Sequence, residues 1–197
     1  MSHATHSPGR SGPAPVQAAH PPETIPAGPL VLRRARPEHA GVIAVAVGES
    51  LDHLRPWMPW ATLEAADKQM QQARIAEAME MWEAGTDYIY SVFIADNGAL
   101  AGSIGLHRRV GDGGIEIGYW IAVGETGRGY ATTAARALTP VAGALPGVER
   151  VEIHCDEANT ASAAIPRKLG YRLDRMEAHE PEAPGERGRR MIWVWER

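Results

Sequence analysis

Cysteine is almost absent from the 197-residue sequence, which has only Cys155, and a single cysteine cannot form an internal disulfide. No apolar run approaches the roughly 20 residues that a membrane-spanning helix needs. Neither sign of charge dominates, because 20 basic residues oppose 24 acidic residues. These absences exclude a disulfide scaffold and a membrane span, and they give no reason to expect bulk binding to nucleic acid or to an anionic membrane. We therefore expect a cytoplasmic protein with no nucleic-acid or membrane partner.

Apolar periodicity is lacking at the N-terminus. Seven of the 15 prolines lie in residues 1–29, together with Gly, Ser and Ala. Such a segment cannot bury enough surface to offset the entropy lost on ordering. We predict a disordered tail over residues 1–29 and one folded domain over residues 30–197. The tail residues His3, His6 and His20 have neither cysteine partners nor close spacing, so we expect no metal site.

The folded part is organised around residues 115–137. An aromatic and β-branched run from Ile115 to Val123 predicts a strand, and a turn with Gly127 and Gly129 leads into an alanine-rich segment with helical spacing. Glycines let a ligand approach the backbone, and a helix N-terminus attracts anions through its N–H groups and dipole. The turn therefore indicates a phosphate-binding loop, although the glycines could also serve only to close the turn.

Two common phosphate loops match this turn badly. A P-loop requires Lys and then Ser or Thr after its last glycine, whereas Tyr130 and Ala131 follow Gly129. A dinucleotide-binding turn requires a third glycine where this chain has Thr132. The P-loop interpretation fails, and the match to a dinucleotide fold is poor.

Hydrophobic periodicity predicts the element order β-α-α-β-β-β-α-β-α-β-β. The strand at 151–155 follows a helix, so it should run parallel to the strand at 115–123. The predicted strands are residues 30–34, 88–96, 100–108, 115–123, 151–155, 171–178 and 191–195.

Two helices are predicted between the first two strands. The first covers residues 39–53, and Thr62 is the predicted N-cap of the second, over residues 63–83. The buried stripe predicted for the first helix contains Val42, Ile43, Ala46 and Val47.

Residues 126–131, TGRGYA, resemble the acyl-CoA pyrophosphate loop of the GNAT N-acetyltransferases, whose pattern is Gln/Arg-x-x-Gly-x-Gly/Ala. They match it at every position but the first, where Thr126 stands. Other segments resemble, in the expected order, the branch that contains the ribosomal-protein N-terminal acetyltransferases: residues 54–60, 116–120, 159–162 and 168–171. The resemblance covers residues 30–197 and implies an α+β GNAT fold, with a mixed central sheet splayed between two parallel strands and flanked by helices.

The resemblance also implies which residues bind acetyl-CoA. Asn159 would bind the pantetheine amide, and Ser162 would hydrogen-bond the CoA sulfur. Backbone groups would hold the pantetheine arm and donate to the oxyanion at Ile121, Ala122 and Val123. N–H groups would hold the pyrophosphate at Gly127, Arg128, Gly129, Tyr130 and Ala131.

Glu116 is the candidate base, because a carboxylate facing the sheet cleft could take a proton from an amine through water. It could instead only pair with an arginine on the sheet surface. His154 is a weaker candidate for the same role. Trp57 and Trp60 could form a wall of the acceptor pocket, where apolar faces desolvate an amine, or they could pack under the next helix.

We therefore predict an acetyl-CoA-dependent N-acetyltransferase that acts on a primary amine, with the N-terminal α-amine of a protein, such as a ribosomal protein, as the favoured acceptor. A small-molecule amine such as an antibiotic or a polyamine is an alternative acceptor. A catalytically silent acyl-CoA-binding module is an alternative of another class. We expect acetyl-CoA as cosubstrate, no metal, and a monomer or homodimer.

Overall fold

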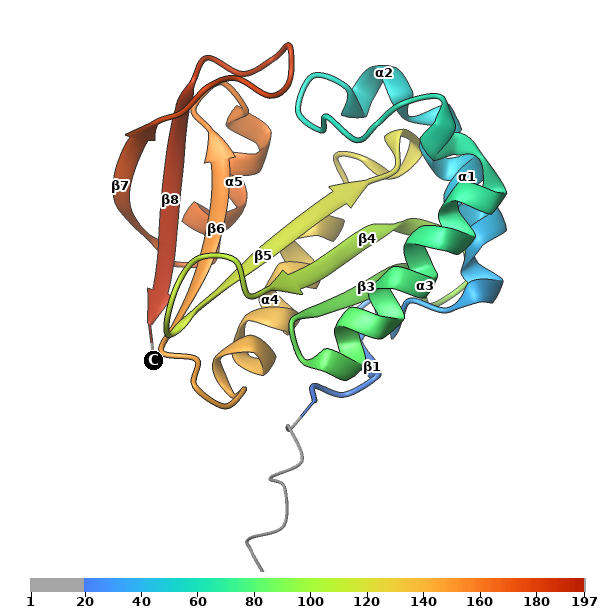
Figure 1. Cartoon of the computed structure of the whole chain (residues 1–197), viewed down its shortest axis with the longest axis horizontal. Coiled ribbons are helices and arrows are strands. Elements are labelled where there is room, and N and C mark those ends of the chain that lie inside the picture. Colours follow the sequence, from blue (N-terminus) through green and yellow to red (C-terminus); the bar gives the residue numbers. More distant parts are fainter. Residues whose placement is uncertain (1–19, 197) are drawn as a thin grey trace, which may run out of the picture.

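The computed structural model describes residues 20–196, which form one mixed sheet of eight strands in the order β1-β2-β3-β4-β5-β6-β8-β7 (Figure 1). The strands are β1 (Thr24–Ala27), β2 (Leu30–Arg34), β3 (Asp87–Ile94), β4 (Leu100–His107), β5 (Gly114–Ile121), β6 (Arg150–Asp156), β7 (Arg172–Ala178) and β8 (Arg189–Glu196). The helices are α1 (Ala40–Glu49), α2 (Leu51–Leu54), α3 (Lys68–Ala84), α4 (Tyr130–Gly143) and α5 (Thr160–Lys168), with short 3-10 turns at Pro37–His39, Glu64–Ala66 and Val123–Glu125. This architecture confirms the predicted α+β fold.

β5 and β6 form the one parallel pair among residues 20–196. They pair at three positions, the last of which joins Glu116 to Glu152, and then diverge (Figure 1). β5 nevertheless stays paired with β4 as far as Ile121, and β6 with β8 as far as Asp156. The predicted splay is therefore confirmed, and beyond Glu116 and Glu152 the facing edges of the two strands have no partner in the sheet.

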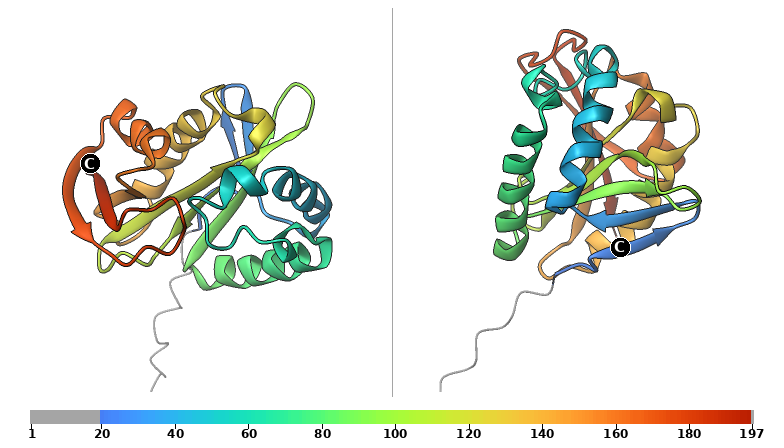
Figure 2. Two further views of the ribbon diagram at one scale, coloured as in Figure 1. Left: turned by 90° about the horizontal axis from the view of Figure 1, so that it is seen from above. Right: turned by 90° about the vertical axis from the view of Figure 1, so that its right-hand side faces the viewer.

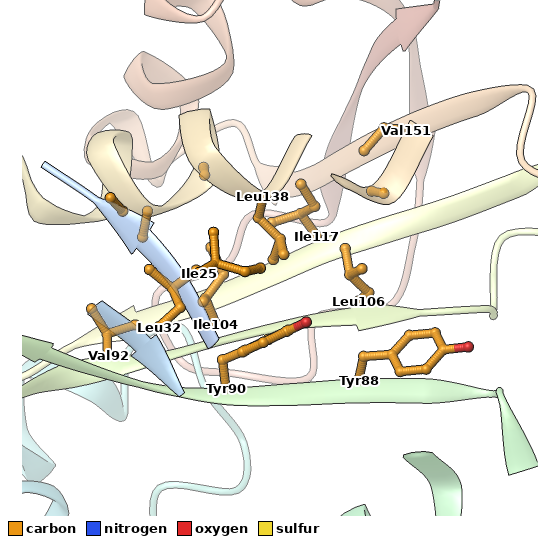
Figure 3. Close-up of a cluster of buried hydrophobic side chains, with 14 of the residues drawn as sticks. Ile25, Leu32, Tyr88, Tyr90, Val92, Ile104, Leu106, Ile117, Leu138 and Val151 are labelled. Carbon is orange, nitrogen blue, oxygen red and sulfur yellow. The ribbon is translucent and has the colours of Figure 1, made fainter. Parts of the chain in front are cut away.

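The two faces of the sheet are covered differently. On one face, Leu138 of α4 packs in the same buried cluster as Ile117 of β5 and Val151 of β6 (Figure 3). On the other face, α1 and α3 lie over β3 and β4, where a smaller cluster includes Ile43 and Ile75 (Figure 2). No helix of the described chain covers β6 on that second face (Figure 1). Glu116 of β5 and His154 of β6 line a cavity there.

β1 lies inside the segment predicted to be a disordered tail. It pairs antiparallel with β2, and Ile25 and Ala27 are buried. The prediction is wrong for this strand because a proline-rich composition hides a short edge strand. Pro26 has no N–H to donate, and a strand with a sheet neighbour on only one side tolerates that loss. The domain therefore extends beyond Leu30 toward the N-terminus, and residues 1–19 lie outside the described residues.

The first predicted helix is divided into α1 and α2 at Ser50. The Ser50 hydroxyl accepts a hydrogen bond from the Val123 N–H at 2.9 Å, a contact between segments far apart in the sequence. Val42 was wrongly included in the buried stripe: it is 48% exposed, whereas Ile43, turned by about 100° around the helix axis, is buried.

The N-cap of α3 is Asp67, and the prediction of Thr62 is wrong. The Asp67 carboxylate accepts hydrogen bonds from the N–H groups of Gln69 and Met70 at 2.8 and 2.9 Å. It therefore satisfies two of the free donors of the first turn. Thr62 instead precedes the short 3-10 turn at Glu64–Ala66.

Removal of β1 should destabilise the fold. A chain that starts at Gly28 loses the pairing with β2, the burial of Ile25 and the hydrogen bond from the Tyr90 hydroxyl to the Pro22 carbonyl at 2.8 Å. Burial of one isoleucine contributes about 1.5–3 kcal/mol, so we expect the free energy of unfolding to fall by about 2 kcal/mol or more relative to a chain that starts at His20. Urea unfolding of the two chains measures this difference, and equal midpoints would contradict a structural role for β1.

Candidate active site

The accessible face of β5 and β6 holds a cavity of about 860 Å³. Glu116 of β5 and His154 of β6 lie in its floor, and its walls come from α1, α3, the loop after α2 and the loop between β7 and β8. A hydrogen bond from the Gly185 N–H to the Pro56 carbonyl at 2.8 Å joins these two loops, which lie close together in Figure 1. The cavity therefore lies beside the splay, where both strands present unpaired edges.

The glycine-rich loop between β5 and α4 has the features of an anion site. Gly127 and Gly129 have φ angles of 75° and 77°, a region that favours glycine, and a Cβ at either position would meet nothing within 4 Å. Gly129 is the N-cap of α4 and supplies no side-chain cap, so the first N–H groups of the helix have no side-chain acceptor at the cap. The turn therefore requires these glycines, and it also leaves open space beside the helix N-terminus, where phosphate binding stays a prediction.

The backbone predicted to hold a pantetheine arm already has partners within the chain. The Ala122 N–H donates to the Ala101 carbonyl at 2.9 Å, and the Val123 N–H donates to Ser50. Ile121 is the last residue of β5. A ligand that used the N–H groups of Ala122 and Val123 would have to replace these contacts.

Asn159 and Ser162 lie together at the N-terminus of α5 and line the cavity. The Asn159 side-chain oxygen caps the helix by accepting the Ser162 N–H at 3.0 Å, which leaves the amide NH₂ for another partner. The Ser162 hydroxyl lies 3.1 Å from the Tyr119 hydroxyl of β5. Burial raises the pKa of Tyr119, so this phenol stays protonated. Tyr119 was missed as a site residue, although it lies in one of the segments that carry the family resemblance.

Cys155 of β6 lies next to this group and lines the same cavity. It is partly buried and packs against the main hydrophobic cluster. Burial raises the pKa of its thiol to about 11, so the group is a neutral thiol near pH 7.

Both oxygens of Glu116 are bound by Arg109, which lies in the loop between β4 and β5. The Arg109 Nε donates to Oε2 at 2.7 Å and Nη2 donates to Oε1 at 3.0 Å. Burial acts to raise the pKa of Glu116, but the hydrogen bonds and charge of Arg109 outweigh it and hold the pKa below its ordinary value. Glu116 is thus an ionised, paired carboxylate, and the arginine pairing considered as the alternative is present.

His154 lies beside Glu116 in the cavity floor. Its Nε2 is 2.6 Å from a carboxylate oxygen of Glu152, and its Nδ1 is 4.0 Å from the nearer oxygen of Glu116. Arg109 and Glu152 were not predicted as members of this group. The strand register indicates both residues. Glu116 is the sheet neighbour of Glu152 in β6, and its neighbour in β4 is His107, two residues before Arg109.

Trp57 and Trp60 both line the cavity, as a wall of an acceptor pocket requires. Trp60 also packs against the smaller hydrophobic cluster, its ring 6.0 Å from the Trp120 ring, and the Arg74 guanidinium lies 5.5 Å from its centroid. Trp60 therefore both lines the cavity and packs in the hydrophobic cluster, so for this residue neither interpretation excludes the other.

Residues 20–196 contain no group of three or more His, Cys, Asp or Glu side chains arranged to hold a metal ion. Within the same residues, no helix is long and apolar enough to cross a membrane. The expectations of no metal and of a cytoplasmic location stay predictions.

The sequence is similar to known acetyltransferases. The family model described as "Acetyltransferase (GNAT) domain" matches residues 29–172. Over 144 residues the chain is 28% identical to YdaF of Bacillus subtilis, provisionally named a ribosomal N-acetyltransferase, and the match covers 72% of this chain and 77% of that protein.

Two solved structures have a similar fold. RimL, named a ribosomal L7/L12 α-N-protein acetyltransferase and solved with coenzyme A, is 19% identical, with a TM-score of 0.79 over 88% of this chain and 98% of RimL. MccE, named a microcin C7 self-immunity acetyltransferase and solved with acetyl-CoA and AMP, is 17% identical, with a TM-score of 0.78 over 86% of this chain and 93% of MccE. At these identities the two structures support the fold alone.

Replacement of Arg109 by Gln should destabilise the fold in a pH-dependent way. The pKa of Glu116 lies below its ordinary 4.5 in the folded chain, so its ionised pair with Arg109 stabilises the fold above about pH 4.5, and this stabilisation is lost as the pH falls through the lowered pKa. Without Arg109 the carboxylate is buried and unpaired at pH 7, whereas near pH 4 it can take a proton. We therefore expect a larger loss of unfolding free energy at pH 7 than at pH 4.

Urea unfolding at the two pH values measures that difference. The control is Arg109→Gln in a Glu116→Gln background, where the pH dependence of the loss should vanish. An equal loss at pH 7 and pH 4 in the single variant would contradict the ion pair as the source of the stabilisation.

Proposed function

The chain belongs to the GNAT acetyltransferase family of acyl-CoA N-acyltransferases, and we propose that it transfers the acetyl group of acetyl-CoA to the N-terminal α-amine of a protein, such as a ribosomal protein. One observation carries the proposal. The glycine-rich loop with free helix N–H groups, the Asn159–Ser162 pair and the cavity that holds Glu116 all border the divergence of β5 and β6. A thioester held at the loop and an amine held in the cavity would meet at the splay.

The residues around the splay suit the donor substrate. The N–H groups from Gly127 to Ala131 would bind the pyrophosphate, for which the loop has space. The free amide NH₂ of Asn159 would donate to the pantetheine arm, alongside the backbone of residues 121–123. Ser162 would donate its hydroxyl proton toward the CoA sulfur, and Tyr119 would hold that hydroxyl in place from 3.1 Å.

The residues of the cavity suit a cationic acceptor that must become neutral before it reacts. The ionised carboxylate of Glu116 would attract the ammonium form and orient it, because Arg109 keeps it charged and fixed. The rings of Trp57 and Trp60 would exclude water from the neutral amine. An α-amine has an ordinary pKa near 8, so about a tenth of it is already neutral at pH 7, and removal of the proton from the rest costs only about 1.4 kcal/mol there.

The relatives bear on the acceptor. YdaF and RimL carry names that refer to ribosomal proteins, which favours a protein N-terminus. MccE carries the name of a self-immunity enzyme and was solved with AMP, which favours a small-molecule acceptor as the second candidate. A silent acyl-CoA-binding module is the third candidate, and the presence of Glu116 and Ser162 together in the cavity argues against it.

Incubation with acetyl-CoA and a panel of acceptors tests the proposal. The panel contains peptides with free N-termini, the same peptides with blocked N-termini and an internal lysine, and small amines including a polyamine. We expect CoA release and a mass increase of one acetyl group, confined to free N-termini. Transfer only to small amines would favour the second candidate, and acetyl-CoA binding without any transfer would favour the silent module.

Substitution of Gly129 by Glu should abolish acetyl-CoA binding, since a carboxylate and its bulk would enter the space for the pyrophosphate. The matched control is Gly147→Glu, because Gly147 also has a left-handed φ, of 72°, and nothing within 4 Å of its Cβ position, but lies in the turn after α4. The two variants share the backbone strain and the added charge. Isothermal calorimetry should detect binding in the control alone, and unchanged affinity in a folded Gly129→Glu chain would place the pyrophosphate elsewhere.

A further inference from the structure

Five charged or titratable side chains form a row along β5 and β6, and three of them, Arg109, Glu116 and His154, line the cavity. Arg150 Nε donates to Glu152 Oε1 at 2.6 Å, and Glu152 Oε2 is 2.6 Å from His154 Nε2. His154 Nδ1 is 4.0 Å from Glu116 Oε2, which Arg109 binds. The row therefore runs cation, carboxylate, imidazole, carboxylate, cation, and His154 is its one member without a fixed charge.

The contact with Glu152 determines which nitrogen of His154 faces the cavity as an acceptor. The Glu152 side chain is 1% exposed and is bound by Arg150, so it is a buried, paired carboxylate, and an ionised carboxylate can only accept hydrogen bonds. His154 Nε2 must then carry the proton and donate it. In the neutral imidazole this leaves Nδ1 with a free lone pair, and its distance of 4.0 Å from Glu116 exceeds a hydrogen bond.

His154 Nδ1 is the open acceptor of the row, whereas both oxygens of Glu116 are already bound. A proton on Nδ1 would make the row alternate in sign along its whole length, with a cation between two carboxylates. Glu116 is a poor proton store, because Arg109 holds both of its oxygens and its pKa is lowered.

We propose that His154 is the proton acceptor of acetyl transfer, that Glu152 is the positioning residue that fixes its tautomer, and that Glu116 orients the ammonium beside Nδ1. This inference rests on the proposed function. The acceptor ammonium loses two protons in all. The first goes to His154 Nδ1 and then to solvent; the freed nitrogen lone pair attacks the thioester carbon, the C–S bond breaks, and the second nitrogen proton ends on the CoA thiolate.

The remaining charged groups that line the cavity come from several of the elements around it. Two of them have carboxylate or imidazole partners of their own: His107 of β4 lies 3.3 Å from Asp87, and Asp156 of β6 lies 3.2 Å from His179. The others are Arg74 of α3, Arg190 of β8, and Glu182 and Glu186 of the loop between β7 and β8. A pH profile of the reaction therefore has to be read against a variant of a second histidine in the same cavity, and His107 offers it.

Kinetics of His154→Gln from pH 6 to pH 9, with His107→Gln for comparison, test the proposal. The glutamine amide can still donate to Glu152, so Glu152 keeps a hydrogen-bond partner at this position. We expect kcat to fall about 100-fold at pH 6.5, the low end for general base catalysis, and the loss to shrink toward pH 9 where the acceptor amine is already neutral. Acetyl-CoA affinity by calorimetry should stay within about twofold, and His107→Gln should not change the shape of the profile.

A second measurement needs no turnover. Long-range ¹H–¹⁵N correlation spectra of the free protein should show neutral His154 protonated at Nε2. Glu152→Gln should remove this tautomer preference, because a glutamine amide can either accept from Nε2 or donate to it. A proton on Nδ1 in the wild type would overturn the inference. So would a His154→Gln chain with wild-type kcat and pH profile, whereas a wild-type chain that acetylates no acceptor would overturn the proposed function itself.

Discussion

Hydrogen bonding between β5 and β6 lasts for only three residue pairs, and the arrangement of the candidate site depends on where it stops. The last pair joins Glu116 to Glu152, so two carboxylates lie side by side at the point of divergence. Adjacent carboxylates repel each other unless each has a cation, and each has one: Arg109 for Glu116, Arg150 for Glu152. Beyond that point the strands separate, and both the free edges and the cavity follow from the separation.

Asp156 is a further buried carboxylate on this face whose charge has hydrogen-bond partners. Asp156, the last residue of β6, is almost fully buried and accepts hydrogen bonds from backbone N–H groups of Ala158, Arg187, Gly188 and Arg189. Burial acts to raise its pKa, but these bonds together hold the pKa below its ordinary range. Asp156 thereby fixes the loop between β7 and β8 against the sheet, and this loop forms one wall of the cavity.

The sequence predicted the local parts of this structure well and the distant contacts poorly. The order of strands and helices from Leu30 onward follows from hydrophobic periodicity, and the parallel pairing of β5 and β6 follows from the helix between them. β1 escaped prediction because its proline-rich composition resembles a tail, while its stability comes from a neighbour, β2, that composition does not describe. Arg109 escaped because a turn residue shows no preference for a partner until the hairpin register brings it to Glu116.

Tyr119 was missed because only the folded chain brings it to Ser162, and its position affects the opening between the strands. The two diverging strands form the arms of a wedge, and the tyrosine reaches from β5 across the opening to Ser162 in α5, the helix that follows β6. The aromatic ring is rigid and its hydroxyl contacts Ser162 at the far end, so the side chain spans a fixed distance. Tyr119 thereby links the two sides of the opening in the absence of a ligand, and this link limits how far they can separate.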